Sequence, residues 1–338
     1  MIATSIILLT ACQSAKSEYV KISDQFFAMD TYITYTIYAP ETEVESMQAL
    51  MVEANALFES IDDLANRFEE VAGVNNIATV NKKAGKEPVV VDEKVIEMVE
   101  LAKQTEEQSQ GAFSVVLGPV SDVWRSYQEG ERTGVPSQDE LEQLRPLLDS
   151  DQLIVDTAEN TLYLTQPDMI LDLGAIAKGY ATEYVANWLE AQGVEHAIVN
   201  AGGNVKTIGT HPVNETFRIG LQDPDNLSSV FGSVQIGATS VVTSGDYQRY
   251  FEYEGQRYHH LIDPQTLQPA RLYRSVSVVT PNSTLADVLS TTLFMMPQHE
   301  GETFIQQYYP DVAVLWYDLA GNISMNPQME ELFTLGGE

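Results

Sequence analysis

The stretch Asp172-Leu-Gly-Ala-Ile-Ala-Lys-Gly-Tyr-Ala181 is the most informative segment of this chain. It follows the short apolar run 169–171 and opens a segment with helical spacing that continues to Gln192 and ends at Gly193. We therefore predict a strand-to-helix junction, where free backbone N–H groups and the positive end of the helix dipole suit a phosphate group. Lys178 would add a mobile positive charge there. The alternative is a capped helix start whose lysine is simply solvated.

The composition limits the partners that the chain can have. It has 338 residues, 44% of them hydrophobic, which is enough for a large core in one domain or in two interlocked ones. It carries 49 Asp and Glu against 18 Lys and Arg, a formal net charge of −31. This charge argues against nucleic acid or an anionic lipid surface bound through a broad basic face. A ligand with phosphates would be repelled, so its site must supply cations or recruit a metal.

The N-terminus contains the single cysteine, Cys12, so no disulfide can form within the chain. The apolar run 6–9 and the small residues before Cys12 resemble a bacterial lipoprotein signal, in which the cysteine is lipidated. We therefore predict a signal segment over 1–11, a polar tether over 12–23 and one domain over 24–338. No Lys or Arg precedes the apolar run, unlike the usual basic start of a secretory signal. The alternative is a buried thiol on a core strand.

The periodicity of the rest of the chain predicts an α+β fold with mostly antiparallel strands and packed helices. The clearest strand signal is the alternation over 31–38, and the clearest helix signal is the 43–64 segment. Asp92 is placed to cap a helix that ends near 108. Further helices are predicted over 284–294 and 300–308, loops over 71–81 and 128–140, and strands over 153–155, 161–165, 196–199, 217–221, 230–236, 247–253, 258–262, 275–279, 312–316 and 322–324.

Three further clusters contain residues that could do chemistry. Glycine turns at 200–204 and 243–246 would let the backbone approach a ligand closely, or they are ordinary turns. Alternation sends the tandem His259 and His260 to opposite faces of a strand, so one can serve as a general base; the alternative is a polar strand edge. Asp287 and Thr291 are four residues apart on one helix face and offer the hard oxygens that Mg²⁺ prefers. Alternatively, Asp287 only interacts with the helix dipole.

Taken in order, these clusters resemble the ApbE family, the FAD:protein FMN transferases. The resemblance covers about residues 24–330 and includes Met29-Asp-Thr31, the stretch 111–114, Gly118-Pro119 and Trp124. It departs from the family pattern at four positions. Asp30 replaces a glycine, Ser114 stands where many members have Asp, Phe68 where many have Tyr, and Leu267 replaces the glycine of an Asp-Pro-x-Thr-Gly turn. These departures bear on flavin affinity more than on the reaction class.

The resemblance implies a fold of two interlocked α/β subdomains and a role for each matching residue. His260 would be the base, and Asp287 would take part in catalysis. Mg²⁺ would be held by Asp287 and Thr291 with backbone oxygens of Ala175 and Ser290. FAD would be contacted by Met29, Phe68, Ala112, Phe113, Ser114, Asp172, Lys178 and Leu261.

The function implied by the resemblance is the Mg²⁺-dependent transfer of FMN from FAD to a Thr or Ser hydroxyl of an acceptor protein. A phosphoester forms and AMP leaves. Members are often exported lipoproteins, which agrees with the reading of Cys12 and implies attachment to the cell membrane on its extracytoplasmic face. Three alternatives remain open: an FAD-binding lipoprotein without transfer, an FAD pyrophosphatase that uses water, and a solute-binding lipoprotein of a transporter.

Overall fold

The computed structural model describes residues 19–336. Strand β1 (Tyr19–Ala28) begins inside the tether predicted for 12–23, so residues 19–23 belong to the folded domain. The predicted signal segment 1–11 and the predicted lipidation site Cys12 lie outside the described residues. Within residues 19–336, no helix is both long enough and apolar enough to cross a membrane.

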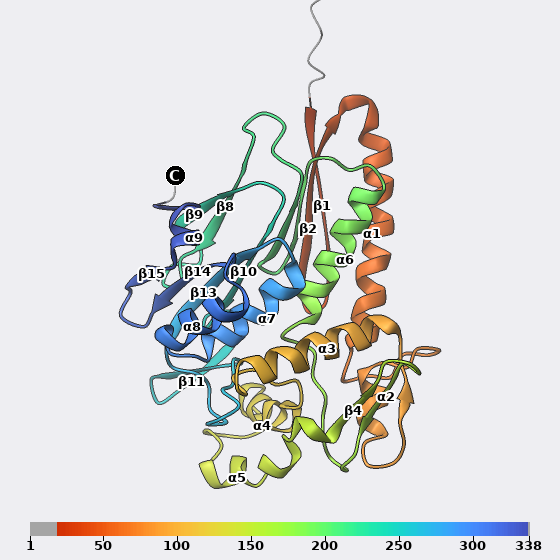
Figure 1. Ribbon diagram of the computed structural model, residues 1–338, viewed down its shortest axis with the longest axis vertical. Helices are drawn as coiled ribbons and strands as arrows, with labels where there is room; N and C mark the ends of the chain where they lie inside the picture. The colour runs from red at the N-terminus through yellow and green to blue at the C-terminus, as the bar shows by residue number, and fades with distance from the viewer. Residues whose placement is uncertain (1–18, 337–338) are drawn as a thin grey trace, which may run out of the picture.

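An eight-stranded sheet forms the centre of the molecule (Figure 1). All neighbouring strands in it are antiparallel. Residues alternate along the strands, so that Ile33, Tyr35 and Ile37 of β2 are all buried. In spatial order the strands are β1, β2 (Thr31–Pro40), β6 (Ala197–Ala201), β7 (Asn204–Ile208), β10 (Ser240–Gly245), β13 (Tyr273–Thr280), β14 (Ala313–Asp318) and β15 (Ile323–Met325).

Helices and a smaller sheet cover this central sheet (Figure 1). Apolar residues of α1 (Val44–Ala65) and α6 (Ala177–Ala191) pack against β1, β2 and β6. A second apolar cluster is formed by α7 (Ser283–Phe294) and α8 (Gln298–Tyr308), which pack against β10, β13 and β14. Another cluster joins the main sheet to a three-stranded sheet and a short helix. These elements are β8 (Phe217–Gln222), β9 (Val230–Ile236), β16 (Phe333–Leu335) and α9 (Pro327–Glu330).

The chain between α1 and α6 builds a second core, in the lower part of Figure 1. Val288 of α7 belongs to this core, so the two parts of the molecule interlock. The predicted α+β class with mostly antiparallel sheets is confirmed. The elements of this part are α2 (Ile77–Lys82), β3 (Val89–Val90), α3 (Glu93–Gln108), α4 (Gly118–Gln128), α5 (Gln138–Glu142), β4 (Leu153–Asp156) and β5 (Thr161–Leu164). A separate two-stranded hairpin consists of β11 (Tyr250–Tyr253) and β12 (Gln256–His259).

Several predicted boundaries are wrong, and the reasons are local. The loop predicted over 71–81 contains most of α2, which the side chain of Asn76 caps by accepting from the Thr79 N–H at 3.0 Å. The run 169–171 is not a strand, because Leu171 bonds through its N–H and carbonyl to the side-chain amide of Asn81. A turn follows, and α6 begins only at residue 177.

The two strands predicted around the tandem histidines are also shifted. Residues 246–249 form a turn, so β11 starts at Tyr250 rather than 247. β12 ends at His259, and Ile262 makes only an isolated bridge to Pro269. His260 therefore lies just beyond the strand, where the chain turns away from its partner.

Candidate active site

A cavity of about 1370 Å³ lies where the part between α1 and α6, the main sheet with α6 and α7, and the β11–β12 hairpin meet. All four clusters singled out in the sequence contribute to its wall. The predicted site residues that line it are Phe68, Ala112, Phe113, Ser114, Asp172, Ala175, Lys178, His260, Leu261, Asp287 and Thr291. Met29 and Ser290 are not among the described residues that line the cavity.

The N-terminus of α6 meets a carboxylate rather than lying free. The N–H of Gly179 donates to Oδ2 of Asp287 at 2.8 Å. A Cβ atom at Gly179 would lie 2.5 Å from both Cβ of Asp287 and the carbonyl oxygen of Ser283. Only glycine therefore allows α6 and α7 to approach this closely. The predicted free N–H groups are wrong for Gly179, and the helix dipole here acts first on Asp287.

Lys178 occupies the second position of α6 and lines the cavity. Its Nζ donates to the carbonyl of Gly174 at 3.2 Å. A positive side chain in the first turn of a helix opposes the helix dipole, so this position is not chosen for helix stability. The nearby carboxylate of Asp287 offsets part of that cost, since the charge of Lys178 acts to lower its pKa.

Asp287 is the buried acid of the cavity wall, with only 5% of its surface exposed. Burial raises the pKa of Asp287, against the opposing effects of Lys178, the Gly179 N–H and the Asn204 side chain. Oδ1 of Asn204 is also buried, and no protein partner for it is found in the described part of the chain. A raised carboxyl pKa beside an unsatisfied buried oxygen is an environment that a bound cation would relieve.

The oxygens around Asp287 fit a magnesium ion. Thr291 lies one turn further along α7 and, like Ala175, lines the same cavity. Carboxylate, hydroxyl and carbonyl oxygens are hard ligands, and Mg²⁺ typically keeps waters and substrate phosphates as its other ligands. Within residues 19–336 there is no group of three His, Cys, Asp or Glu side chains able to hold a metal. An ion here would therefore rely on one carboxylate, neutral oxygens and the substrate.

Ser290 does not face the cavity. Its hydroxyl is fully buried, bonds to the hydroxyl of Ser244 at 2.8 Å, and donates to the carbonyl of Asp287 at 3.0 Å. The Ser244 hydroxyl lies 3.3 Å from that of Thr291. Ser290 therefore helps to fix the surroundings of the two candidate ligands, while the predicted role of its backbone oxygen as a metal ligand stays a prediction.

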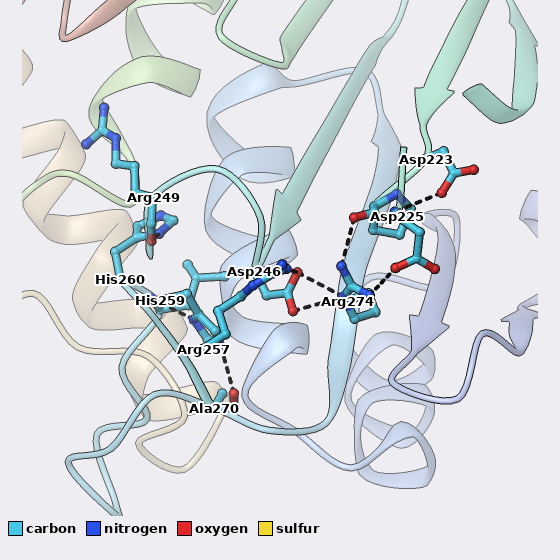
Figure 2. Close-up of polar contacts among 11 residues, drawn as sticks. Asp223, Asp225, Asp246, Arg249, Arg257, His259, His260, Ala270 and Arg274 are labelled. Atoms are coloured by element: carbon cyan, nitrogen blue, oxygen red, sulfur yellow. Dashed lines mark hydrogen bonds and ion pairs between the residues drawn. The ribbon is translucent and has the colours of Figure 1, made fainter. Parts of the chain in front are cut away.

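The two histidines have separate roles (Figure 2). His259 is buried and donates from Nε2 to the carbonyl of Ala270 at 2.8 Å, while its Nδ1 accepts from the N–H of Leu261 at 3.2 Å. Burial lowers the pKa of His259 to about 4. Both ring nitrogens are occupied and the ring is neutral, so His259 is a structural residue of the hairpin.

His260 faces the cavity. Its Nδ1 lies 3.3 Å from the carbonyl of Arg249, and because a carbonyl only accepts, Nδ1 carries the proton and Nε2 keeps a lone pair. His260 is an exposed residue of the cavity wall. Desolvation by the neighbouring protein, followed by the positive charge of Arg249, lowers the pKa of His260 below its ordinary value. His260 is thus a neutral proton acceptor at the cavity wall.

The acid of the 243–246 turn is an anchor rather than a ligand-binding group. Asp246 is buried and accepts from Nε of Arg274 at 3.0 and 3.1 Å and from Nη1 of Arg257 at 3.3 Å (Figure 2). Arg257 belongs to β12 and Arg274 to β13, so Asp246 ties the hairpin to the main sheet. Arg274 also pairs with Asp225. Thr243 and Ser244 of this turn do line the cavity.

The structure adds an arginine–aromatic cluster that we did not predict from the sequence. Arg67 pairs with Asp122 at 2.6 Å and, through Nε, with Asp172 at 3.0 Å. The guanidinium groups of Arg67 and Arg125 lie 4.4 and 4.2 Å from the centre of the exposed Phe68 ring. Asp172 is therefore already partnered, and Phe68 presents a cation-supported aromatic face to the cavity. Basic residues are scarce in this sequence, and that scarcity was the one signal that could have drawn attention to Arg67 and Arg125.

Two departures from the family pattern have clear structural consequences. Leu267 is buried and keeps a left-handed backbone with φ of 62°, the conformation in which glycine is unstrained. Its carbonyl accepts from the indole N–H of Trp124 at 2.9 Å, which helps to hold the turn. Asp30 is left-handed too, with φ of 58°, and its neighbour Met29 packs against both large cores behind the cavity wall.

A sequence model of the ApbE family matches residues 29–316. The chain belongs to the ApbE family. An FAD:protein FMN transferase of Klebsiella pneumoniae (strain 342) is 35% identical over 258 residues, covering 75% of this chain and 79% of that protein. A protein of the same name from Vibrio cholerae is 30% identical over 300 residues, covering 88% and 87% of the two chains.

Solved structures of ApbE proteins share the whole fold. The ApbE protein of Thermotoga maritima superposes with a TM-score of 0.81 at 26% identity, over 93% of this chain and 98% of that one. The flavin transferase ApbE of Vibrio cholerae gives a TM-score of 0.81 at 25% identity, over 93% and 99%. The cavity of this ApbE family member is therefore described within a fold that is shared almost from end to end.

Proposed function

We propose that this protein is an FAD:protein FMN transferase that uses Mg²⁺ and joins FMN to a Thr or Ser hydroxyl of an acceptor flavoprotein. The observation that carries the proposal is the convergence of His260, Lys178 and the Asp287/Thr291 pair on one cavity. A base, a cation and hard oxygens are what phosphoryl transfer from a dinucleotide requires. The names of the related proteins support the same activity.

The reaction balances as a single displacement at phosphorus. The acceptor hydroxyl oxygen forms a bond to the phosphorus of the FMN moiety, and the bond from that phosphorus to the AMP oxygen breaks. Nε2 of His260 takes the hydroxyl proton, and AMP leaves with the bonding electrons. The lone pair on Nε2 is available because Nδ1–H is fixed by the Arg249 carbonyl.

The cavity's charges explain how a base with a depressed pKa can work. The protein groups around the His260 ring disfavour its charged form. An incoming diphosphate adds negative charge nearby, which raises the pKa of His260 and stabilises the protonated ring that forms during transfer. Lys178 supplies positive charge for the diphosphate. Mg²⁺, if held by Asp287, Thr291 and Ala175, would neutralise further phosphate charge.

The test is in-gel flavin fluorescence of a purified acceptor domain that carries the flavinylation Thr or Ser. The protein is incubated with FAD and Mg²⁺, and AMP and free FMN are measured alongside. Fluorescence on the acceptor with one AMP per flavin supports transfer. AMP and free FMN without a labelled acceptor would instead identify an FAD pyrophosphatase, and FAD binding without any AMP would identify a flavin-binding protein.

We also propose that Cys12 carries a lipid that holds the domain at the extracytoplasmic face of the cell membrane. The support is the sequence pattern, an apolar run ending in Ala11-Cys12 and a polar stretch before β1 begins at Tyr19. Replacing Cys12 by Ala should move the protein from the membrane fraction to the soluble periplasmic or secreted fraction. An unchanged membrane fraction would contradict the lipid anchor without affecting the proposed reaction.

A further inference from the structure

An ion pair crosses the cavity wall between two distant parts of the chain. Nη2 of Arg249 lies 2.9 Å from Oδ2 of Asp30 and also donates to the Asp30 carbonyl at 3.3 Å. Both residues line the cavity, and 219 positions separate them. One partner comes from the β1–β2 turn and the other from the turn before β11.

The β1–β2 turn is held in a costly conformation. Met29 and Asp30 form its two central residues, with φ of 52° and 58°. A two-residue hairpin turn of this kind normally uses Asn-Gly or Asp-Gly, since left-handed backbone strains other residues. The turn is also fixed to α1, because the Met29 N–H donates to Oδ2 of Asp62 at 2.9 Å. A non-glycine residue kept in a strained and rigid turn beside a cavity suggests a function for its side chain.

The other partner is joined directly to His260. The carbonyl of Arg249 accepts from the backbone N–H of His260 at 3.1 Å and from its Nδ1 at 3.3 Å. Figure 2 shows the Arg249 side chain extending away from the His260 ring, so the side chain and the carbonyl act in different directions. Among the described strands, β11 and β12 pair only with each other. The position of Arg249 therefore sets that of the His260 ring, and the main sheet does not hold this hairpin through its ladder.

We propose that Asp30 is a positioning residue, which acts through Arg249 to hold His260 in place. The inference rests on the proposed function, since it assigns Asp30 a part in placing the proposed base. The Asp30 side chain contacts Arg249 rather than His260. It fixes the guanidinium, and the backbone of the same arginine fixes the imidazole.

The size of the effect follows from the exposure of the pair. The side chains of Arg249 and Asp30 are 46% and 77% exposed, so solvent and salt screen their attraction. An exposed ion pair contributes modestly, and we expect its loss to lower kcat about threefold to fivefold at low salt. The loss should shrink in about 1 M salt, where screening weakens the pair in the unaltered protein as well.

The primary variant is Asp30→Asn, because asparagine tolerates the left-handed backbone and removes only the charge. The matched control is Asp168→Asn, since Asp168 is exposed and also left-handed, with φ of 67°, and is not among the described residues of the cavity wall. We expect a lower kcat with an unchanged KM for FAD in Asp30→Asn and no change in the control. A raised KM with unchanged kcat would overturn positioning in favour of substrate contact.

Two further variants separate positioning from stability. Asp30→Gly relieves the backbone strain, so its unfolding midpoint should be equal or higher while kcat falls as in Asp30→Asn. Arg249→Met should lower kcat, and adding Asp30→Asn to it should cause little further loss, because both remove the same interaction. Additive losses in the double variant, or normal kcat in Asp30→Gly, would overturn the proposal.

A readout independent of activity keeps this test separate from that of the proposed function. In the unaltered protein, the imidazole NMR signals of His260 should report Nδ1–H hydrogen bonding to a carbonyl. Asp30→Asn should broaden or shift these signals, and Asp168→Asn should leave them unchanged. If the protein shows no FMN transfer at all, the proposed function fails, whereas unchanged His260 signals in Asp30→Asn contradict the positioning role itself.

Discussion

The carboxylate of Asp287 accepts a hydrogen bond from the N–H of Gly179 at 2.8 Å, across 108 positions of sequence. This contact joins the start of α6 to α7 and places Lys178 beside the candidate magnesium ligands. The two sequence motifs therefore form one site, because a carboxylate caps the helix that carries the lysine.

The close approach of α6 and α7 predicts that Gly179→Ala is destabilising. The new Cβ would lie 2.5 Å from Cβ of Asp287 and from the Ser283 carbonyl, where nothing can move cheaply. Overpacking of this kind costs about 1–3 kcal/mol, measurable by urea unfolding. Gly237→Ala is the control, since its Cβ would meet only a methyl group of Thr210 at 3.9 Å. Equal stability of the two variants would contradict the described helix contact.

Lys178→Ala should separate stability from ligand binding. Removing a cation from the first turn of α6 relieves an unfavourable interaction with the helix dipole, so the variant should be no less stable. Its dissociation constant for FAD should rise about tenfold or more, the usual size of losing one charged contact. Isothermal titration and thermal unfolding measure the two effects. Lys82→Ala removes an exposed lysine outside the cavity and is the control; unchanged FAD affinity in Lys178→Ala would exclude a phosphate contact.

Because the His259 ring is buried in its neutral form, we expect the folded protein to lose stability in acid. Its pKa falls from about 6.5 in the unfolded chain to about 4 in the folded protein, because burial disfavours the charged ring. The contribution of the neutral ring to the free energy of unfolding is fully present above pH 6.5 and is lost as the pH falls through about 4. The shift corresponds to roughly 3 kcal/mol.

The difference in unfolding free energy between the unaltered protein and His259→Gln isolates this contribution. The effects of other titrating groups, such as Asp287, are nearly the same in both proteins and cancel in the difference. Unfolding free energies from urea titrations at several pH values should converge as the pH falls from 6.5 to 4. A constant difference over this range would show that the buried neutral histidine is not the cause.

His260 should respond to the ligand rather than to the fold. In the free protein its pKa lies below the ordinary value, and the negative diphosphate of FAD should raise it. An NMR titration of the imidazole signals, assigned with His260→Gln, measures both values. His299 lies outside the described cavity wall and serves as the internal reference. A His260 pKa that FAD leaves unchanged would argue against this residue as the proton acceptor.

Periodicity predicted the long elements well and the short ones poorly. α1 and α3 have enough turns for their apolar spacing to be unmistakable, and Asp92 caps α3 as predicted, accepting from the Lys94 N–H at 2.9 Å. α2 is a six-residue helix whose apolar residues cover too few turns to stand out. The run 169–171 is apolar because it is buried, and its hydrogen bonds go to Asn81 rather than to a strand.

The site was predictable as a set of residues but not as a set of partners. The sequence identified His260, Lys178 and Asp287 because the order of motifs resembles a known family. It could not show that Asp246 points to Arg274, or that Arg67 neutralises Asp172, because these pairs depend on tertiary distances. The tandem histidines were predicted to alternate along one strand, but β12 ends at the buried His259, so His260 reaches the cavity wall from the turn that follows.

The intact mass of an acceptor domain, incubated with FAD, Mg²⁺ and either the unaltered protein or Asp287→Asn, measures the proposed transfer itself. Asparagine can still accept from the Gly179 N–H, so the fold is retained while the charge is lost. We expect the unaltered protein to add the mass of FMN minus one water, with equimolar AMP. Asp287→Asn should do so at least about 100-fold more slowly. No mass change with the unaltered protein, or equal rates for both, would contradict the proposal.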